Sequence, residues 1–241
     1  MFEAFGWGLA GGLALVIGAI AGLTIKISTR TIGLIMGFGA GVLISAVSFE
    51  LTDEAYKQAG ADAVGIGLAL GAVSFFLADA AVEARGGGDR KSSKGEQSGG
   101  AAQGIVIGAL MDGIPESLTI GISLLGGGAV ALPVVVAVFL SNIPESLAAA
   151  TGLRKAGRSA RWIIGLWIGV ALISGLASAL GYALLGGASD NIVGGIQAFA
   201  AGAILTMLAN TMFPEAVEDT GKAAGLVTVL GFALAFFLSR L

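Results

Sequence analysis

The chain of 241 residues contains no cysteine and no histidine. These absences exclude disulfides, thiolate metal sites and imidazole metal sites, and they leave oxygen atoms and methionine sulfur as metal ligands. Charge is also scarce, because Asp, Glu, Lys and Arg make up only 12 % of the sequence. An ordinary soluble domain carries about 25 % charged residues. The chain therefore has too few charges to cover a water-facing surface of its size.

Apolar residues dominate instead, at 56 % of the sequence and a mean hydropathy of +0.92. Apolar runs of about 20 residues recur along the chain, and each is long enough to cross a bilayer as a helix. The runs lack the period-2 alternation of a membrane β-barrel. We expect an all-α polytopic membrane protein with eight transmembrane helices, at residues 5–25, 31–52, 63–84, 102–125, 129–152, 162–185, 192–213 and 223–240.

Lysine and arginine are distributed unevenly between the expected loops. Eleven of them follow the first, third, fifth and seventh spans, whereas only Lys57 and Arg240 fall on the opposite side. Because basic residues accumulate in cytoplasmic loops, we expect both termini outside. The segment 85–101 is interpreted as a flexible, solvated cytoplasmic loop in a single transmembrane transport domain, 1–241. The compact loops favour a prokaryotic inner (plasma) membrane.

Two parts of the sequence resemble each other. Residues 38–55 align without gaps on residues 199–216, and both segments contain a shared phenylalanine, a shared Ala-Gly pair and a shared Glu-Ala pair. The expected topology gives the two segments opposite directions across the membrane. The repeat is therefore inverted, which is typical of secondary transporters.

The motif Ile-Pro-Glu-Ser-Leu occurs twice, in the fourth and fifth expected spans. Asp112 and Glu116 share one helix face, as do Ser141 and Glu145, and Asn142 lies on the adjoining stripe. Each proline frees the carbonyl group four residues earlier. Carboxylates at bilayer depth are costly unless they are paired, solvated or bound to a cation. We therefore predict an oxygen-rich divalent metal site formed by Asp112, Glu116, Ser141, Asn142 and Glu145.

Other polar residues lie near the ends of the expected spans. Glu50 and Glu54 either form an outer pathway or mark the end of the second span. Asp79 is interpreted as an interfacial residue. The residues that would line an inner pathway are Asn210, Glu215 and Asp219, although Glu215 and Asp219 could also simply lie at the interface.

The paired Pro-Glu motifs resemble those of the ZIP family of metal transporters. That family has eight spans, both termini outside, an inverted repeat of spans 1–3 and 6–8 around spans 4–5, and a binuclear metal site between spans 4 and 5. Its span 4 motif reads His-Asn-x-Pro-Glu-Gly, so the resemblance places Asp112, Gly113 and Glu116 at the His, Asn and Glu positions. Asn142 and Glu145 match family ligand positions in span 5.

The two motifs also depart from the family, because neither contains histidine and Gly113 supplies no ligand. An all-oxygen site suits Mn²⁺ or Fe²⁺ at least as well as Zn²⁺. The predicted function is transport of a divalent metal cation, such as zinc, manganese or iron, and not enzymatic catalysis. The alternatives are an intramembrane hydrolase that uses Asp112, a passive cation channel and a purely structural bundle. The expected partners are the metal ion and the lipid bilayer, with no cofactor and no nucleic acid, and a homodimer is left open.

Overall fold

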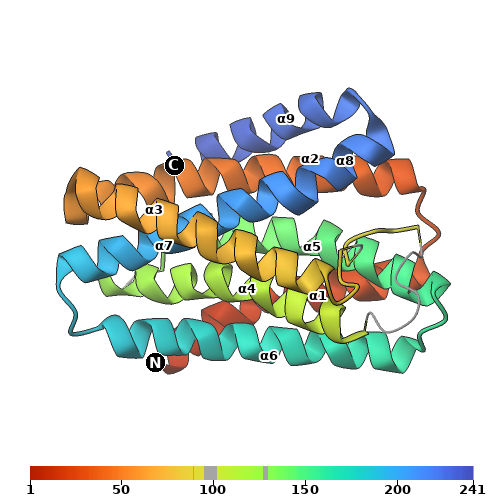
Figure 1. Cartoon of the computed structure of the whole chain (residues 1–241), viewed down its shortest axis with the longest axis horizontal. Helices are drawn as coiled ribbons and strands as arrows, with labels where there is room; N and C mark the ends of the chain where they lie inside the picture. The colour runs from red at the N-terminus through yellow and green to blue at the C-terminus, as the bar shows by residue number, and fades with distance from the viewer. Residues whose placement is uncertain (89, 95–101, 127–129, 241) are drawn as a thin grey trace.

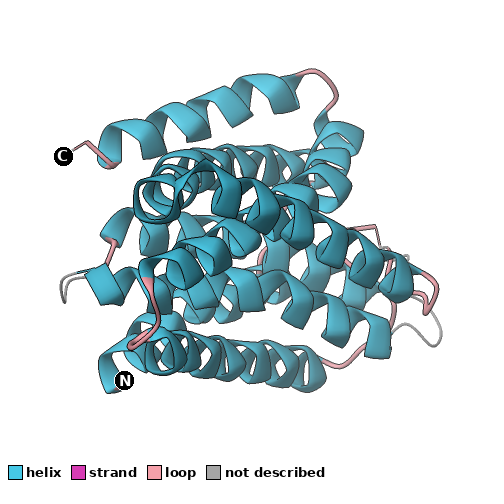
Figure 2. Ribbon diagram, turned by 60° about the vertical axis from the view of Figure 1, so that its left-hand side comes forward, coloured by secondary structure: helices cyan, strands magenta, loops and turns pink. Residues whose placement is uncertain are grey.

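The computed structural model describes residues 1–88, 90–94, 102–126 and 130–240, and its secondary structure is helical throughout (Figure 2). The helices lie lengthwise beside one another (Figure 1). The α-helices are α1 (Phe2–Thr24), α2 (Thr29–Ala46), α3 (Asp53–Glu83), α4 (Ala102–Ser123), α5 (Leu132–Lys155), α6 (Ala160–Leu185), α7 (Asp190–Met207), α8 (Phe213–Thr220) and α9 (Ala223–Leu238). The wider π-helical turns are η1 (Val47–Thr52) and η3 (Leu208–Met212), and the short 3₁₀ turn is η2 (Leu124–Gly126).

Six helical segments within the described residues are long and apolar enough to cross a membrane. They are Phe2–Thr24, Thr29–Glu83, Gly104–Ser123, Leu132–Lys155, Ala160–Leu185 and Asp190–Thr220. Large apolar side chains on the outer helices are exposed, including Leu70 at 57 %, Leu176 at 54 % and Leu230 at 62 %. Such apolar surface is rare on soluble monomers. The all-helical fold is therefore consistent with a polytopic membrane protein.

Two of the eight predicted spans do not appear as separate long helices. The segment Thr29–Glu83 is counted as one stretch, although its backbone leaves the helical conformation at Gly60, where φ is +74°. Figure 1 shows that α2 and most of α3 run in opposite directions along the bundle. Glycine adopts positive φ without the steric cost that other residues have. The final helix, α9, has only 16 residues.

The connections that carry most of the basic residues lie at one end of the bundle. Figure 1 places the turns after α1, α3, α5 and α8 at the same end, on the right of the view. Both chain termini and the α6–α7 connection lie at the other end. The end that carries the turns after α1, α3, α5 and α8 is called the basic end. The uneven distribution of lysine and arginine along the sequence thus becomes an uneven distribution between the two ends of the fold.

Helix α2 packs against α9, and α7 packs against α3 in the same way. A Cβ atom at Gly41 of α2 would overlap the carbonyl oxygen of Thr228 in α9. At the aligned position in the repeat, a Cβ at Gly202 of α7 would overlap the carbonyl oxygen of Leu68 in α3. Small residues allow helix backbones to approach closely within membranes. The two copies of the repeat therefore use the same kind of backbone contact.

The helix also widens at the same aligned point of both copies. The turn η1 begins at Val47 and η3 begins at Leu208, and these two residues are aligned in the repeat. In η1, the hydroxyl of Thr52 donates a 2.8 Å hydrogen bond to the carbonyl oxygen of Val47. Single π turns within α-helices are rare and are frequent at functional sites. The sequence repeat thus corresponds to a shared backbone irregularity.

Candidate cation site

The five residues of the predicted metal site are buried in the middle of α4 and α5. Their exposed fractions are 2 % for Asp112, 1 % for Glu116 and Ser141, and 4 % for Asn142 and Glu145. Each helix continues through an internal proline, Pro115 in α4 and Pro144 in α5. Because proline has no N–H group, each helix has one carbonyl group without its usual partner. Carboxylates buried among apolar helices are costly unless they are paired, solvated or bound to a cation.

The compensating charge comes from Lys91, which lies between α4 and α5. Its Nζ atom is 3.1 Å from Oδ2 of Asp112 and 3.3 Å from Oε2 of Glu145. The lysine side chain is itself buried, with 3 % exposed. The two predicted ligand carboxylates are therefore brought together around a cation, and that cation belongs to the protein.

Arg90 extends this network to α3. Its Nη2 atom is 2.9 Å from Oδ1 of Asp79, and its Nε atom is 3.3 Å from Oδ2 of Asp112. Asp79 also accepts a 3.2 Å hydrogen bond from the side-chain amide of Asn210. Asp79 is buried, with 3 % of the residue exposed, so it belongs to the ionic network and does not face solvent.

Both basic side chains carry their charge in this environment. Burial alone would lower the pKa of Lys91, but the carboxylates of Asp112 and Glu145 outweigh burial and raise that pKa above its ordinary value. The pKa of Arg90 is likewise raised, because Asp112 and Asp79 outweigh the effect of burial. Opposite charges nearby stabilise the charged form of a group. The cluster is thus an ionic network in which Arg90 and Lys91 together contribute two positive charges.

Glu116 completes the acidic side of the cluster. It is close enough to Glu145, Lys91 and Asp112 to interact with their charges. Its Oε1 atom is buried and accepts no hydrogen bond from any described residue. A buried polar atom without a partner costs free energy. The Oε1 atom of Glu116 therefore remains available as a metal ligand while Lys91 lies between Asp112 and Glu145.

The two uncharged residues of the predicted site make bonds to the backbone. The Ser141 hydroxyl donates a 3.0 Å hydrogen bond to the carbonyl oxygen of Val138 on the same helix. The Asn142 amide donates a 3.1 Å hydrogen bond to the carbonyl oxygen of Gly11 on α1. Asn142 therefore ties the proline-containing part of α5 to α1.

A cavity of about 10 Å³ remains beside this network. That space is comparable to a single water molecule. It is lined by Arg90, Lys91, Ile105, Ala109, Asp112, Glu145, Ala149 and Trp167. Across the described part of the chain, no three acidic side chains lie close enough together to hold a metal ion in this conformation. The space between Asp112 and Glu145 is filled by the lysine.

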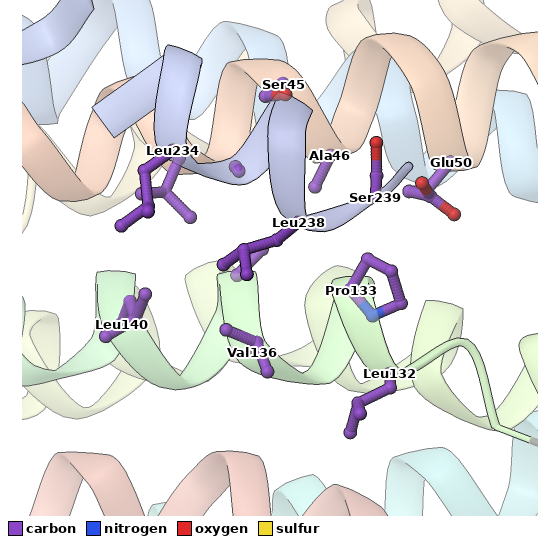
Figure 3. Close-up of a pocket in the computed structure, with 13 residues that line it drawn as sticks. Ser45, Ala46, Glu50, Leu132, Pro133, Val136, Leu140, Leu234, Leu238 and Ser239 are labelled. Atoms are coloured by element: carbon purple, nitrogen blue, oxygen red, sulfur yellow. The ribbon is translucent and has the colours of Figure 1, made fainter. Parts of the chain in front are cut away.

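A larger cavity of about 370 Å³ lies between α2, α5 and α9. Figure 3 shows Glu50 and Ser239 at one end of it, whereas the leucine side chains Leu140, Leu234 and Leu238 line the remainder. Its lining is mainly apolar, and it does not contain the buried carboxylates of α4 and α5. This cavity is therefore distinct from the ionic network, although Leu140 directly precedes Ser141 of the predicted site.

The other predicted outer residue, Glu54, is exposed at the start of α3. It accepts a 3.1 Å hydrogen bond from the side chain of Gln58. Lys57 lies 4.0 Å from it and forms a closer ion pair of 2.8 Å with Asp53. Glu54 therefore lies in a surface cluster at the end of the bundle opposite the basic end, and Glu50 lies nearer the interior.

The predicted inner residues lie near the basic end. Asn210 is exposed and bonds to Asp79, whereas Glu215 and Asp219 of α8 are partly buried. Lys94 forms ion pairs with two acids of α8, with Glu218 and, at 3.4 Å, with Asp219. The same short segment of chain thus contacts the predicted site and part of the predicted inner pathway.

That segment, residues 85–88 and 90–94, is here called the inserted loop. The interpretation of 85–101 as solvated is wrong for residues 90–93, which are 1–3 % exposed. Residues 89 and 95–101 lie outside the described residues. At Gly86, where φ is +80°, the chain turns back after α3, and the N–H of Gly87 bonds to the carbonyl oxygen of Val82. From α5, Lys155 donates a 2.8 Å hydrogen bond to the carbonyl oxygen of Ser93.

The sequence contains a signal for the inserted loop that lies outside the paired Pro-Glu motifs. Several acids lie within the apolar spans, whereas lysine and arginine lie in the segments between spans, apart from Arg240 at the end of the last span. Buried carboxylates need opposite charges. The compensating cations therefore had to come from a loop, and the Arg90–Lys91 pair follows a run of three glycines that allows the chain to turn inward.

No protein-family model matches the sequence, and no curated protein matches it closely enough to identify a relative.

Proposed function

We propose that the chain is a divalent metal transporter whose cation site lies between α4 and α5. One observation carries the proposal: Asp112 and Glu145, on two proline-containing helices, converge on a single positive charge at 3.1 and 3.3 Å. The charge lies among apolar helices that are long enough to cross a membrane. Buried ionisable residues in such helices commonly mark ion pathways.

The packing supports a transporter over a rigid structural bundle. Aligned glycines mediate the α2–α9 and α7–α3 contacts, and aligned π turns interrupt the two repeated segments. Reciprocal contacts of this kind fit an inverted repeat, in which one group of helices moves against the other around a central site. We further propose eight crossings, with the basic end cytoplasmic, in a prokaryotic inner membrane, as in the ZIP family that the motifs resemble.

The chemistry of the ligands favours a hard or borderline divalent ion. Three carboxylates, Asp112, Glu116 and Glu145, are available on α4 and α5, together with carbonyl groups freed by the prolines. Carboxylate and carbonyl oxygens suit Mg²⁺, Mn²⁺ and Fe²⁺, and they also bind Zn²⁺. Glu50 would lie on the outer side of the pathway, and Asp219 on the inner side.

The intramembrane hydrolase has less support. It would require Asp112 to exchange a proton with a second acid during catalysis. Asp112 is instead ion-paired with Arg90 and Lys91, both of which favour its ionised form. The arrangement resembles a neutralised cation site more than a catalytic dyad.

The proposal is tested by metal uptake into liposomes that contain the purified protein. The variants are Glu116→Gln and Glu145→Gln, which preserve side-chain size and remove one charge each. We expect saturable Mn²⁺ uptake by the original chain and at least a tenfold loss in both variants. The control is Asp62→Asn, which removes a charge from an exposed residue of α3 that belongs neither to the site nor to the inserted loop.

Uptake that survives in both site variants would place the cation path elsewhere. Uptake that rises linearly without saturation would favour a passive channel. Absence of uptake of Mn²⁺, Fe²⁺ and Zn²⁺ by the original chain, in liposomes where it is folded, would refute the proposed function.

A further inference from the structure

We propose that the inserted loop is an internal competitor of the transported metal, with Arg90 and Lys91 occupying the cation site until a divalent ion displaces them. The inference rests on the proposed function and adds its regulation. It follows from the position of Lys91, whose Nζ lies between the two carboxylates that would bind the metal. A metal ion and this ammonium group cannot occupy the same place.

The charges of the two occupants are matched. Arg90 and Lys91 together bring two positive charges into the cluster, which equals the charge of one divalent cation. Exchange of the loop for the metal therefore leaves the net charge of the buried site unchanged. A buried carboxylate that loses its only cation is strongly unfavourable. The site is thus expected to hold either the loop or the metal and to avoid the empty state.

The inserted loop also covers the route to the basic end. Lys94 is paired with Glu218 and Asp219 on α8, and Lys155 of α5 holds the backbone of Ser93. These contacts connect the loop to α5 and α8 between the buried site and that end of the bundle. Withdrawal of the loop would therefore free the site and part of its inner pathway in one movement.

The loop is held in a way that permits withdrawal. Its contacts to the cluster are ion pairs and hydrogen bonds, and the chain re-enters the bundle after the glycines Gly86, Gly87 and Gly88. Glycine residues provide the backbone freedom that a hinge needs. A metal can shift such an equilibrium only through a difference in its affinity for the two states. Direct competition for Asp112 and Glu145 provides that difference.

The first experiment measures the position of the loop. The chain has no cysteine, so Ser93→Cys introduces a single thiol. Ser93 is 1 % exposed and its Oγ has no hydrogen-bond partner among the described residues, so the exchange is conservative. We expect a polar thiol reagent to label Ser93→Cys in detergent at least tenfold faster with saturating Mn²⁺ than with a chelator.

The second experiment measures metal affinity. Removal of the competitor, by Arg90→Gln with Lys91→Gln, is expected to increase Mn²⁺ affinity at least tenfold. Only protein whose inserted loop has left the site can bind Mn²⁺, so the apparent affinity of the original chain is reduced in proportion to that fraction. The same pair of changes in the Ser93→Cys chain is expected to make labelling fast without Mn²⁺. Mn²⁺ binding is followed directly by electron paramagnetic resonance.

Matched variants separate these effects from simple loss of charge or of folding. Lys222→Gln removes one exposed basic residue near the same end of the bundle and should leave labelling and affinity unchanged. Lys91→Arg keeps the positive charge, so the inserted loop should stay in the site and labelling should remain slow without Mn²⁺. If the double variant does not fold, Lys94→Gln provides the second test, because it releases the loop from α8 without altering the buried cluster. It should accelerate labelling at least threefold.

The outcomes distinguish the inference from the proposed function. Tight Mn²⁺ binding with labelling that is the same with and without Mn²⁺ would refute the competitor and leave the transporter proposal intact. Unchanged affinity in a folded double variant would do the same. Absence of Mn²⁺ binding in every folded variant would refute the proposed function, and the competition with it, even if Lys94→Gln still accelerates labelling.

Discussion

At the scale of residues, the site is defined by an imbalance between acids and bases. Asp79, Asp112, Glu116 and Glu145 face the charges of Arg90 and Lys91 within a buried cluster. Asp112 is paired with both bases, whereas Glu116 Oε1 has no hydrogen-bond partner among the described residues. Glu116 therefore contributes least to the conformation in which the inserted loop occupies the site, and it is the carboxylate most available to a metal.

Because of this imbalance, Glu116→Gln should weaken metal binding and at the same time stabilise the metal-free protein. Glu116→Gln replaces a buried carboxyl group whose Oε1 atom has no hydrogen-bond partner among the described residues, so it should not destabilise the metal-free protein and should raise its free energy of unfolding by about 1 kcal/mol. The same change should weaken Mn²⁺ binding at least tenfold. Thermal unfolding in detergent and a Mn²⁺ titration measure the two effects. A large loss of stability would show that Glu116 has a structural partner.

Binding of the metal should itself stabilise the original chain. A ligand that binds only the folded state at 100 times its dissociation constant adds about 2.7 kcal/mol. We therefore expect the unfolding midpoint to rise when Mn²⁺ is added and to return when a chelator removes it. In Glu145→Gln the rise should be small, because one of the two converging carboxylates has lost its charge.

At the scale of elements, close backbone contacts and irregular turns are placed alike in the two copies of the repeat. Gly41 and Gly202 bring α2 to α9 and α7 to α3, and η1 and η3 begin at aligned residues. These features cluster along the two repeated segments and leave the outer faces of α3, α6 and α9 apolar and exposed. The elements therefore combine a tightly packed interior with a surface that suits lipid.

Alanine substitutions in α7 test the close contact. A Cβ at Gly202 would overlap the backbone of Leu68, whereas a Cβ at Gly195 of the same helix meets nothing within 4 Å. Gly202→Ala should destabilise the protein by about 1–3 kcal/mol through overpacking. Gly195→Ala should be neutral or stabilising by up to about 1 kcal/mol, because alanine is the better helix former. Thermal unfolding compares the two, and equal midpoints would argue against the α3–α7 contact.

At the scale of the whole molecule, the two ends differ in charge and in the segments they expose. The turns after α1, α3, α5 and α8 share the basic end, and both termini lie at the other (Figure 1). Six long apolar segments account for part of the proposed eight crossings. The reversal at Gly60 and the short helix α9 must supply the remainder.

Single cysteines in this cysteine-free chain test the number of crossings. We expect a membrane-impermeant thiol reagent to label Lys57→Cys from outside intact cells. Arg158→Cys and Lys222→Cys should be labelled only after the membrane is permeabilised, because they lie at the basic end. Labelling of Lys57→Cys and Lys222→Cys from the same side would reduce the number of crossings and refute the proposed topology.

Much of the fold could be predicted from composition and spacing. Apolar runs and scarce charge indicate a helical membrane protein, because a lipid-facing backbone must satisfy its own hydrogen bonds. The aligned segments 38–55 and 199–216 predicted a repeat that the shared π turns reflect. The eight spans do not all appear as separate long helices, because the chain reverses at Gly60 within α3 and because α9 has only 16 residues.

The acids of α4 and α5 were found in the sequence because a charge within an apolar run is unusual wherever it occurs. Their spacing alone placed Asp112 with Glu116, and Ser141 with Glu145, on one face of each helix. Only the tertiary structure brought Arg90, Lys91 and Asp79 to them. These residues are distant along the chain, and charge pairing acts through space, so no local pattern distinguishes a lysine that turns into the bundle from one that remains in water.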